Sequence, residues 1–483
     1  MRISREIFFL KVIKAIALLV FLSFGFHDLI YAQEDVKKST AVGDQDKTGL
    51  HLVKAKETFY SLSKLYNCTI SDIKELNPGM LYPKEGEYIK VPGGETEIVR
   101  EKIKSVPDEE SVLLSGTYNT AKQYRVVLMI PLRLEDVQTM GPVETSNPLD
   151  WKNHPSFRYI QFYQGFMMAA DSLKQKGLKV QIDVFDVGQE LSKAVSAVED
   201  PDFAKADLII GPFFKNTFEY VASFAKRYEI PIINPLTQRD DIIQDNEFVV
   251  KLLPSRKGQA MELAKLVKLE FQGYEIILVS GNKMQNAEEL SGLKDAIAEI
   301  NPHLKIKEID YSTDNINGII DAASIIKPNL IIIYSEGEVL ATEVLSRLSE
   351  IKEGYLFTVV GLPDWDKFEH LDFGYMMKLN THIFLSSFVD YEDPDVKIFV
   401  TSFRDRYFSE PQEFAFSGFD AGMFFLDLLM RSGNKILPAM NKSNIPLIHA
   451  KFRFEKLENG GYDNMFWNIV RLQDYKMVPV TLD

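Results

Sequence analysis

The sequence contains a single cysteine, Cys68, among its 483 residues. One thiol excludes an internal disulfide and any structural metal site built from several cysteines. We expect this thiol to be buried and to act as a small apolar group rather than a reactive one.

Catalytic motifs are also missing from the sequence. The seven histidines are scattered, and no HExxH, GxSxG or P-loop motif is found. Asp364 and Asp366 stand one residue apart in one segment, with nothing to separate an acid from a base. We therefore expect a protein that is not an enzyme and has no cofactor, no catalytic residues and no metal site.

Basic residues are outnumbered, because 55 Lys and Arg face 69 Asp and Glu, for a net charge of −14. Such an acidic surface argues against nucleic acid and anionic lipid as partners. The hydrophobic content of 46% is that of a globular protein, and the length predicts two or three domains.

The one stretch that approaches membrane length lies at the start of the sequence. Four basic residues precede an apolar run at 15–26, and Ile30-Tyr31-Ala32 offers a small-residue cleavage site. This pattern predicts a signal peptide at residues 1–32, with an uncleaved anchor as the alternative. Since no cysteine ends the leader, we expect a non-lipidated protein of the periplasm or cell envelope.

A small module is predicted after the leader. Residues 33–48 are polar without periodicity and are expected to form a linker. Residues 49–94 then show the pattern of a strand, two short helices and a second strand. Thr69 and Asp72 form a short capping box at the start of the second helix.

Residues 49–94 resemble a LysM domain over nearly their whole length. The resemblance is carried by Glu-Thr-Phe-Tyr-Ser-Leu at 57–62, Leu-Asn-Pro at 76–78 and Val-Pro at 91–92. It implies binding of peptidoglycan through its N-acetylglucosamine-containing glycan, in a groove between two turns. The residues that it assigns to the glycan are Glu57, Thr58, Phe59, Tyr60, Asn77, Pro78, Gly79, Met80 and Leu81.

The rest of the chain is predicted to be one large α/β region. Residues 95–122 mix charged and small residues and are expected to be a flexible linker. From residue 123 to 483, short apolar runs alternate with amphipathic helical stretches in two successive series, which predicts two lobes. Near the end, segments 450–454, 466–472 and 477–480 alternate like antiparallel strands.

The plainest α/β unit is at 207–236. An apolar run stops at Gly211-Pro212, the apolar period then becomes helical, and a second β-branched run follows at 230–234. Two buried strands joined by one helix form a right-handed crossover in a parallel sheet. Ligands of such sheets lie beyond the carboxyl ends of the strands.

The region 123–483 resembles a type I periplasmic binding protein of the branched-chain amino-acid receptor kind. The resemblance is carried by Tyr163-Gln164-Gly165, by 208–212 followed by 230–235, and by Gly418-Phe419-Asp420-Ala421. It implies a doubly wound, two-lobed fold that closes by hinge motion on a small polar, amino-acid-like ligand. The fold class is therefore expected to be α/β, with a small βααβ LysM module before this two-lobed domain.

The predicted ligand-binding residues follow strands of both lobes. A helix start offers free backbone N–H groups to a carboxylate, and carboxylates from the other lobe would bind an amine. The candidates are Lys215, Asn216, Thr217, Thr237 and Arg239 in the first lobe and Glu336, Asp364 and Trp365 in the second.

A second hypothesis gives the large region a different class of function. Phe213-Phe214 stands where amino-acid receptors of this family generally place small hydroxyl residues, and the insertion at 132–156 is long for a strand–helix loop. In this alternative the region is a ligand-free scaffold or regulator that docks a cell-wall synthase or hydrolase, or another envelope protein. A cleft filled by aromatic side chains or by the insertion would favour the scaffold.

Overall fold

The computed structural model describes residues 2–3, 48–53, 58–66, 68–77, 80, 83, 88–92, 118–139, 154–351 and 354–482. The chain divides into two compact units, residues 24–108 and residues 1–23 with 109–483. Nearly all of the predicted leader and linkers, and most of the insertion at 132–156, lie outside the described residues. Among the described helices, none has both the length and the apolar character needed to cross a membrane.

The small unit has the order strand, helix, helix, strand. These elements are β2 (Thr48–Leu52), α2 (Phe59–Leu65), α3 (Ile70–Leu76) and β3 (Tyr88–Pro92), and the two strands pair antiparallel. Capping boxes open both helices, at Thr58 with Ser61 and at Thr69 with Asp72. Cys68 is half-buried against a core that includes Leu62 and Ile73, and burial raises the pKa of its thiol.

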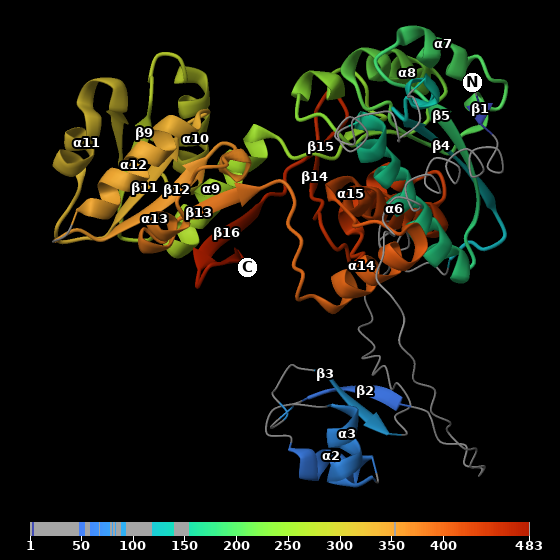
Figure 1. Cartoon of the computed structure of the whole chain (residues 1–483), viewed down its shortest axis with the longest axis horizontal. Coiled ribbons are helices and arrows are strands. Elements are labelled where there is room, and N and C mark those ends of the chain that lie inside the picture. Colours follow the sequence, from blue (N-terminus) through green and yellow to red (C-terminus); the bar gives the residue numbers. More distant parts are fainter. Residues whose placement is uncertain are drawn as a thin grey trace, which may run out of the picture. The chain divides into compact units, whose positions relative to one another are not determined.

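The first lobe of the large unit is a mixed sheet with helices on both faces (Figure 1). Its strand order is β1-β5-β4-β6-β7-β8-β15-β14. Neighbours from β5 to β15 pair parallel, and the two outermost strands, β1 and β14, pair antiparallel. The strands are β1 (Arg2–Ile3), β4 (Gln123–Ile130), β5 (Lys179–Asp186), β6 (Leu208–Ile210), β7 (Ile232–Asn234), β8 (Val249–Lys251), β14 (Phe454–Lys456) and β15 (Tyr462–Asn464).

Two helical layers cover this sheet. The core on one face is shared with α6 (Pro155–Gln175), α15 (Glu413–Ser432) and α16 (Ile436–Ala439). The core on the other face is shared with α7 (Leu191–Val198) and α8 (Lys215–Arg227). The short helix α4 (Leu134–Thr139) follows β4, and α14 (Pro394–Tyr407) packs on α15.

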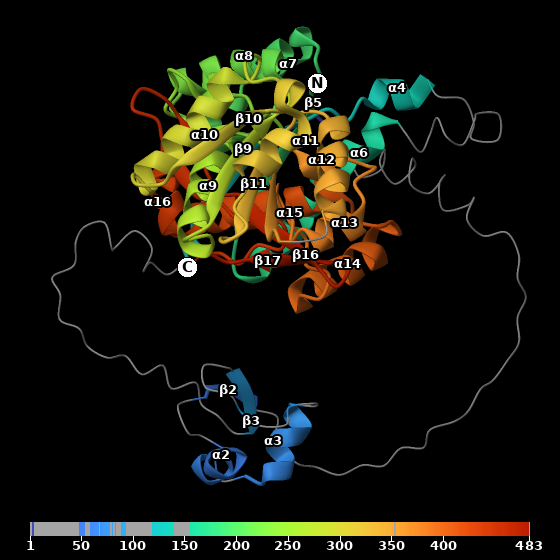
Figure 2. The ribbon, with the colours of Figure 1, turned by 90° about the vertical axis from the view of Figure 1, so that its left-hand side faces the viewer.

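The second lobe repeats this architecture with the strand order β10-β9-β11-β12-β13-β16-β17. Helices α9 and α10 cover one face, and α11, α12 and α13 the other, as Figure 2 shows. The first five strands are parallel and the last two pairings antiparallel. The strands are β9 (Glu275–Ser280), β10 (Ile306–Asp310), β11 (Asn329–Tyr334), β12 (Phe357–Leu362), β13 (His382–Leu385), β16 (Asn468–Gln473) and β17 (Lys476–Val480), and the helices are α9 (Arg256–Glu270), α10 (Ala287–Ile300), α11 (Tyr311–Ala322), α12 (Glu338–Glu350) and α13 (Phe373–Lys378).

The two-lobed α/β architecture predicted from the sequence is confirmed, but some boundaries differ. The strand expected at 450–454 begins only at Phe454, because the amide of Ala450 donates to the side chain of Asp420 on α15 instead of pairing in a sheet. Strand β15 was not predicted, since three residues are too few to show a period. The sequence pattern predicts a helix over 316–326, and α11 does continue from residue 316 but ends at Ala322. It is preceded by a turn that Asp310 caps, and the non-helical backbone of Asn315, with φ 48°, separates this turn from the rest of the helix.

The chain crosses between the lobes three times, at residues 252–255, 386–393 and 465–467. The first and third crossings lie side by side, because the amide of Ser255 donates to the carbonyl of Asn464 at 3.1 Å and the Trp467 indole donates to the Ser255 carbonyl at 2.8 Å. At the second crossing the amide of Phe388 donates to the carbonyl of His449 at 2.8 Å. Short crossings that lie together in this way are the kind of connection about which two lobes can rotate.

Helices α6 and α15 approach one another so closely that only glycine fits at two contacts. A Cβ on Gly165 would lie 1.9 Å from the Ala415 carbonyl oxygen, and a Cβ on Gly418 would lie 2.0 Å from the Phe162 carbonyl oxygen. Gly165 and Gly418 both belong to the motifs that carry the receptor resemblance. Their role is therefore to set the distance between two core helices.

We predict that Gly418→Ala destabilises the large unit by about 2–3 kcal/mol, because the added methyl group meets backbone that cannot move aside. Gly292→Ala in α10 is the matched control, since its Cβ meets nothing within 4 Å. The control should gain about 0.5–1 kcal/mol from helix propensity. Urea unfolding of both variants measures this, and equal stability of the two would contradict the packing argument.

Candidate functional site

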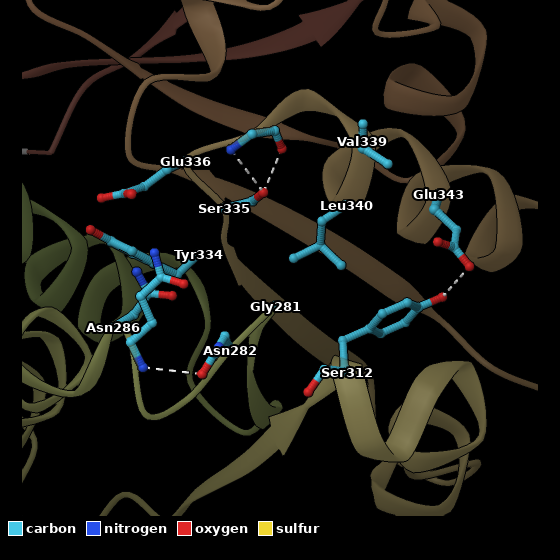
Figure 3. A pocket seen from close by; sticks show the side chains of 13 residues that line it. Gly281, Asn282, Asn286, Ser312, Tyr334, Ser335, Glu336, Val339, Leu340 and Glu343 are labelled. Carbon is cyan, nitrogen blue, oxygen red and sulfur yellow. Dashed lines mark hydrogen bonds between the residues drawn. The ribbon is translucent and has the colours of Figure 1, made fainter.

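A pocket of about 450 Å³ opens at the carboxyl ends of β9, β10 and β11 in the second lobe (Figure 3). Ligands of doubly wound sheets lie at this edge. The residues that line it are Gly281, Asn282, Gln285, Asn286, Tyr311, Ser312, Tyr334, Ser335, Glu336, Gly337, Val339, Leu340 and Glu343.

Two helices begin at this pocket with uncapped ends. Asn286 and Gly337 are the N-cap residues of α10 and α12, and neither makes a side-chain capping hydrogen bond. Their first backbone N–H groups therefore remain available to an acceptor on a ligand. The first turns also carry acidic residues, among them Glu288 and Glu338.

The polar side chains of the pocket supply both donors and acceptors. Asn282 is held by its own loop, because its side-chain oxygen accepts from the amides of Met284 and Gln285 at 3.1 Å. The hydroxyl of Ser335 donates to the carbonyl of Gly337 at 2.5 Å. Glu336 stands between Ser335 and Gly337 in the same loop (Figure 3), and it forms no hydrogen bond or ion pair within the described part of the chain.

Tyr334 forms the inner wall of the pocket. It is the last residue of β11, and its ring is 5% exposed. Burial raises the pKa of its hydroxyl to about 12, and the negative charges of Glu289 and Glu336 add to the effect. This hydroxyl stays protonated at physiological pH and is available as a neutral donor.

The other two candidates of the second lobe lie outside this pocket. The Asp364 carboxylate binds the guanidinium of Arg256 through two contacts, one of 3.1 Å. Burial raises the Asp364 pKa, but the hydrogen bonds and charge of Arg256 outweigh burial and leave it below its usual value. Trp365 is 2% exposed, and its indole lies against the backbone of Gly361. Its role in the structure is packing within the core.

The charged candidates of the first lobe are paired with one carboxylate. Asp241 accepts from the amine of Lys215 at 2.9 Å and from the guanidinium of Arg239 at 2.8 Å. The hydrogen bonds from Arg239 and then Lys215 lower the pKa of Asp241 to about 2. A ligand anion would therefore compete with an internal carboxylate at this position.

The neutral candidates of the first lobe differ in exposure. Thr217 is fully buried, and its hydroxyl donates to the carbonyls of Gly188 and Phe214 at 3.1 and 3.0 Å. Asn216 is exposed on α8, and Thr237 is half-buried. The structure thus brings Lys215 and Arg239 together at Asp241 but does not bring the polar candidates of the first lobe into a shared pocket.

The turn after β6 is filled by aromatic rings. Phe213 is 1% exposed and packs edge-on against Tyr159 and Phe162, with centroid distances of 5.7 and 5.1 Å. It also stacks on Phe414, and half-buried Phe214 meets Tyr159 at 6.2 Å. At this turn, where the resemblance led us to expect small hydroxyl residues in an amino-acid receptor, the structure has an apolar cluster.

Asn234 joins this turn to the next one. It is fully buried at the end of β7, its amide donates to the carbonyl of Pro212 at 3.2 Å, and its oxygen accepts from the amides of Leu236 and Thr237 at 2.9 and 2.8 Å. One side chain therefore fixes the loops after β6 and β7 relative to each other.

The candidates of the small unit are only partly described. Glu57, Pro78, Gly79 and Leu81 lie outside the described residues, as does the side chain of Tyr60. Phe59 is buried in the core, and Met80 packs against it. Thr58 caps α2. The Asn77 side chain binds the backbone of Ile73 and Lys90.

Sequence reasoning missed most residues of the pocket. Each of three pocket residues, Asn282, Ser312 and Ser335, follows a predicted parallel strand within a few residues. The rule that ligands lie beyond the carboxyl ends of such strands, applied to the second lobe as it was to the first, would have selected them. Within the described residues, no cluster of His, Cys, Asp and Glu could hold a metal ion.

We predict that Asn234→Ala lowers the free energy of unfolding by about 2 kcal/mol, because buried backbone groups of both loops lose their partners. Asn216→Ala serves as control, and this exposed site should change stability by less than about 0.5 kcal/mol. Denaturant titration measures both values. Equal effects would show that the loops do not depend on Asn234.

The sequence and the structure were compared with those of known proteins. No curated protein matches the sequence. A structure from Rhodospirillum rubrum, named for branched-chain amino acid ABC transporters, is 14% identical, covers 74% of this chain and 100% of its own, and has a TM-score of 0.53. The ABC transporter substrate-binding protein of Desulfitobacterium hafniense in complex with Leu is 16% identical, with the same coverage and a TM-score of 0.45.

Haemophilus influenzae LpoA is 12% identical, with coverages of 77% and 61% and a TM-score of 0.47. At these identities the likeness concerns the fold alone. The periplasmic binding protein family, in contrast, matches residues 160–474, which are more than half of the sequence. The chain therefore belongs to the periplasmic binding protein family.

Proposed function

We propose that this protein is a non-catalytic protein of the periplasm or cell envelope whose large unit binds a small polar, amino-acid-like ligand. The observation that carries the proposal is the pocket at the carboxyl edge of the second lobe, where Glu336 has no partner among the described residues and lies beside two uncapped helix starts. A carboxylate suits the helix starts, and an amine suits Glu336. Members of the family are in general binding proteins rather than enzymes.

The hinge would convert ligand binding into motion. The lobes are joined by three short crossings, of which the first and third are tied by hydrogen bonds. A ligand held in the second lobe and touched by the first would favour a closed arrangement through its differential contacts. The closed arrangement is what a partner protein would recognise.

The small unit is proposed to bind peptidoglycan. Its strand–helix–helix–strand order with an antiparallel strand pair is consistent with the LysM-like motifs of the sequence. The Asn77 side chain ties the end of α3 to β3 through the backbone of Ile73 and Lys90. A glycan would contact the turns before α2 and after α3.

A second candidate function is supported by the first lobe. Phe213 and its neighbours fill the turn after β6, and Lys215 and Arg239 are paired with Asp241. A lobe whose two charged candidates are already paired and whose turn after β6 is apolar suits a ligand-free scaffold that docks a cell-wall synthase or hydrolase. The two functions differ in whether any small molecule stabilises the fold.

We expect one or more amino acids or muropeptides to raise the melting temperature of the protein. A ligand at a hundred times its Kd stabilises the native state by about 2.7 kcal/mol. Glu336→Gln should reduce the shift, whereas the exposed control Glu350→Gln on α12 should leave it unchanged. Absence of any shift at millimolar concentration would rule out the ligand function and favour the scaffold.

For the small unit, we expect the protein to co-sediment with purified peptidoglycan and to be released by soluble N-acetylglucosamine oligomers. A variant that lacks residues 49–94 should remain in the supernatant, because the proposed glycan contacts all lie there. If the shortened chain sediments as well as the complete one, the small unit is not the anchor.

A further inference from the structure

A second hollow lies beside the first, on the same helix. It has a volume of about 560 Å³ and is lined by residues of α12 together with His370. Val339 and Glu343 line both hollows, so the two share a wall along α12. A single amino acid would occupy only part of a depression of this combined extent.

Two charged side chains in the hollows have no partner within the described part of the chain. Glu336 lies in the first hollow, and Arg347 lies in the second. The other carboxylates are engaged: Glu338 contacts the backbone amide and the ring of His370, the latter at 3.1 Å, and Glu343 accepts from the Tyr311 hydroxyl at 3.3 Å. The Glu336 carboxylate and the Arg347 guanidinium, which have no partner among the described residues, therefore lie toward opposite ends of the combined depression.

The spacing of these charges defines a ligand length. From Glu338, the first residue of α12, to Arg347 the helix rises about 14 Å, and Glu336 lies beyond its start. An extended peptide rises about 3.3 Å per residue, so about five residues cover this distance. A free amino acid cannot reach both charges.

The wall between the ends suits an extended chain. Val339 is 82% exposed on the ridge shared by the hollows and offers an apolar contact. Thr342 and Ser346 follow along the helix in the second hollow, and their short hydroxyl side chains leave room while offering hydrogen bonds.

We propose that the two hollows form one groove along α12 that binds a short peptide of about five residues, with its terminal ammonium at Glu336 and its terminal carboxylate at Arg347. The inference rests on the proposed ligand-binding function and makes its ligand class specific. In a peptide the first carbonyl groups, rather than the terminal carboxylate, would accept from the uncapped helix starts beside Glu336. It assigns the second hollow, which the sequence did not indicate, to the same site.

The test uses the complete chain with penta-alanine, its N-acetylated form, its C-terminally amidated form, and alanine as the short comparison. The free pentapeptide should bind at least tenfold more tightly than alanine, because it alone reaches both ends. Blocking either end should weaken binding by about fivefold, which is the upper range for an exposed charge pair.

Two variants assign the ends. Glu336→Gln should bind the free and N-acetylated peptides equally, and Arg347→Gln should bind the free and amidated peptides equally. Glu350→Gln lies on the same helix outside both hollows and should behave as the wild type. Calorimetric titration gives the affinities, and the melting temperature of each unliganded variant shows that it is folded.

The outcomes separate the two levels of the proposal. If alanine binds as tightly as penta-alanine and Arg347→Gln changes nothing, the peptide groove is wrong while the ligand function stands. If neither alanine, the peptides nor any amino acid binds, both are wrong. Tight binding of the free pentapeptide with the expected pattern of end blocking supports both.

Discussion

The side-chain amide of one buried residue, Asn464, ties together the segments in which the chain passes between the two lobes. Its nitrogen donates to the Leu252 carbonyl at 2.8 Å, and its oxygen accepts from the amides of Arg453 and Phe466 at 3.1 Å. Asn464 ends a strand of the first lobe, and its partners lie on the first crossing, on the third and on a neighbouring segment. Each of these backbone groups would cost about 1–3 kcal/mol if left buried without a partner.

A second buried polar group supports the remaining crossing. The Asp420 carboxylate accepts from the amides of Ile448, His449 and Ala450 at 2.7–2.9 Å, and His449 in turn binds the crossing at Phe388. Burial raises the pKa of Asp420 to about 7, against the opposing effect of the three N–H donors. Asp420, the acidic residue of the late-helix motif, therefore positions the segment that contacts the second crossing, and it does not line the candidate pocket.

The architecture was predictable from the sequence to a greater extent than the site. Apolar runs such as 276–280 and 330–334 are long enough to show strands, and turns at their ends locate the functional edge. Ion pairs are harder to predict from the sequence. Lys215 and Arg239 both bind the carboxylate of Asp241, and the position of Asp241 depends on how the loop after β7 folds back on α8. The burial of single side chains is equally hard to predict. Of two adjacent phenylalanines, Phe213 is buried in the core, whereas Phe214 is only half-buried at its edge. Glu336 was predicted because it comes just after a strand, and it lines the pocket at the end of β11.

The walls of the candidate pocket all come from the second lobe, so a molecule that binds there would meet a complete surface before any movement of the lobes. A ligand that meets a surface complete before closure is captured by a single encounter, so its association rate depends on diffusion to that lobe and not on how often the hinge closes. Closure of the first lobe over the bound molecule would then lower its dissociation rate, since that lobe would only have to cover it. In such a protein a stiffer or looser hinge would change the residence time and leave the rate of capture almost unaltered.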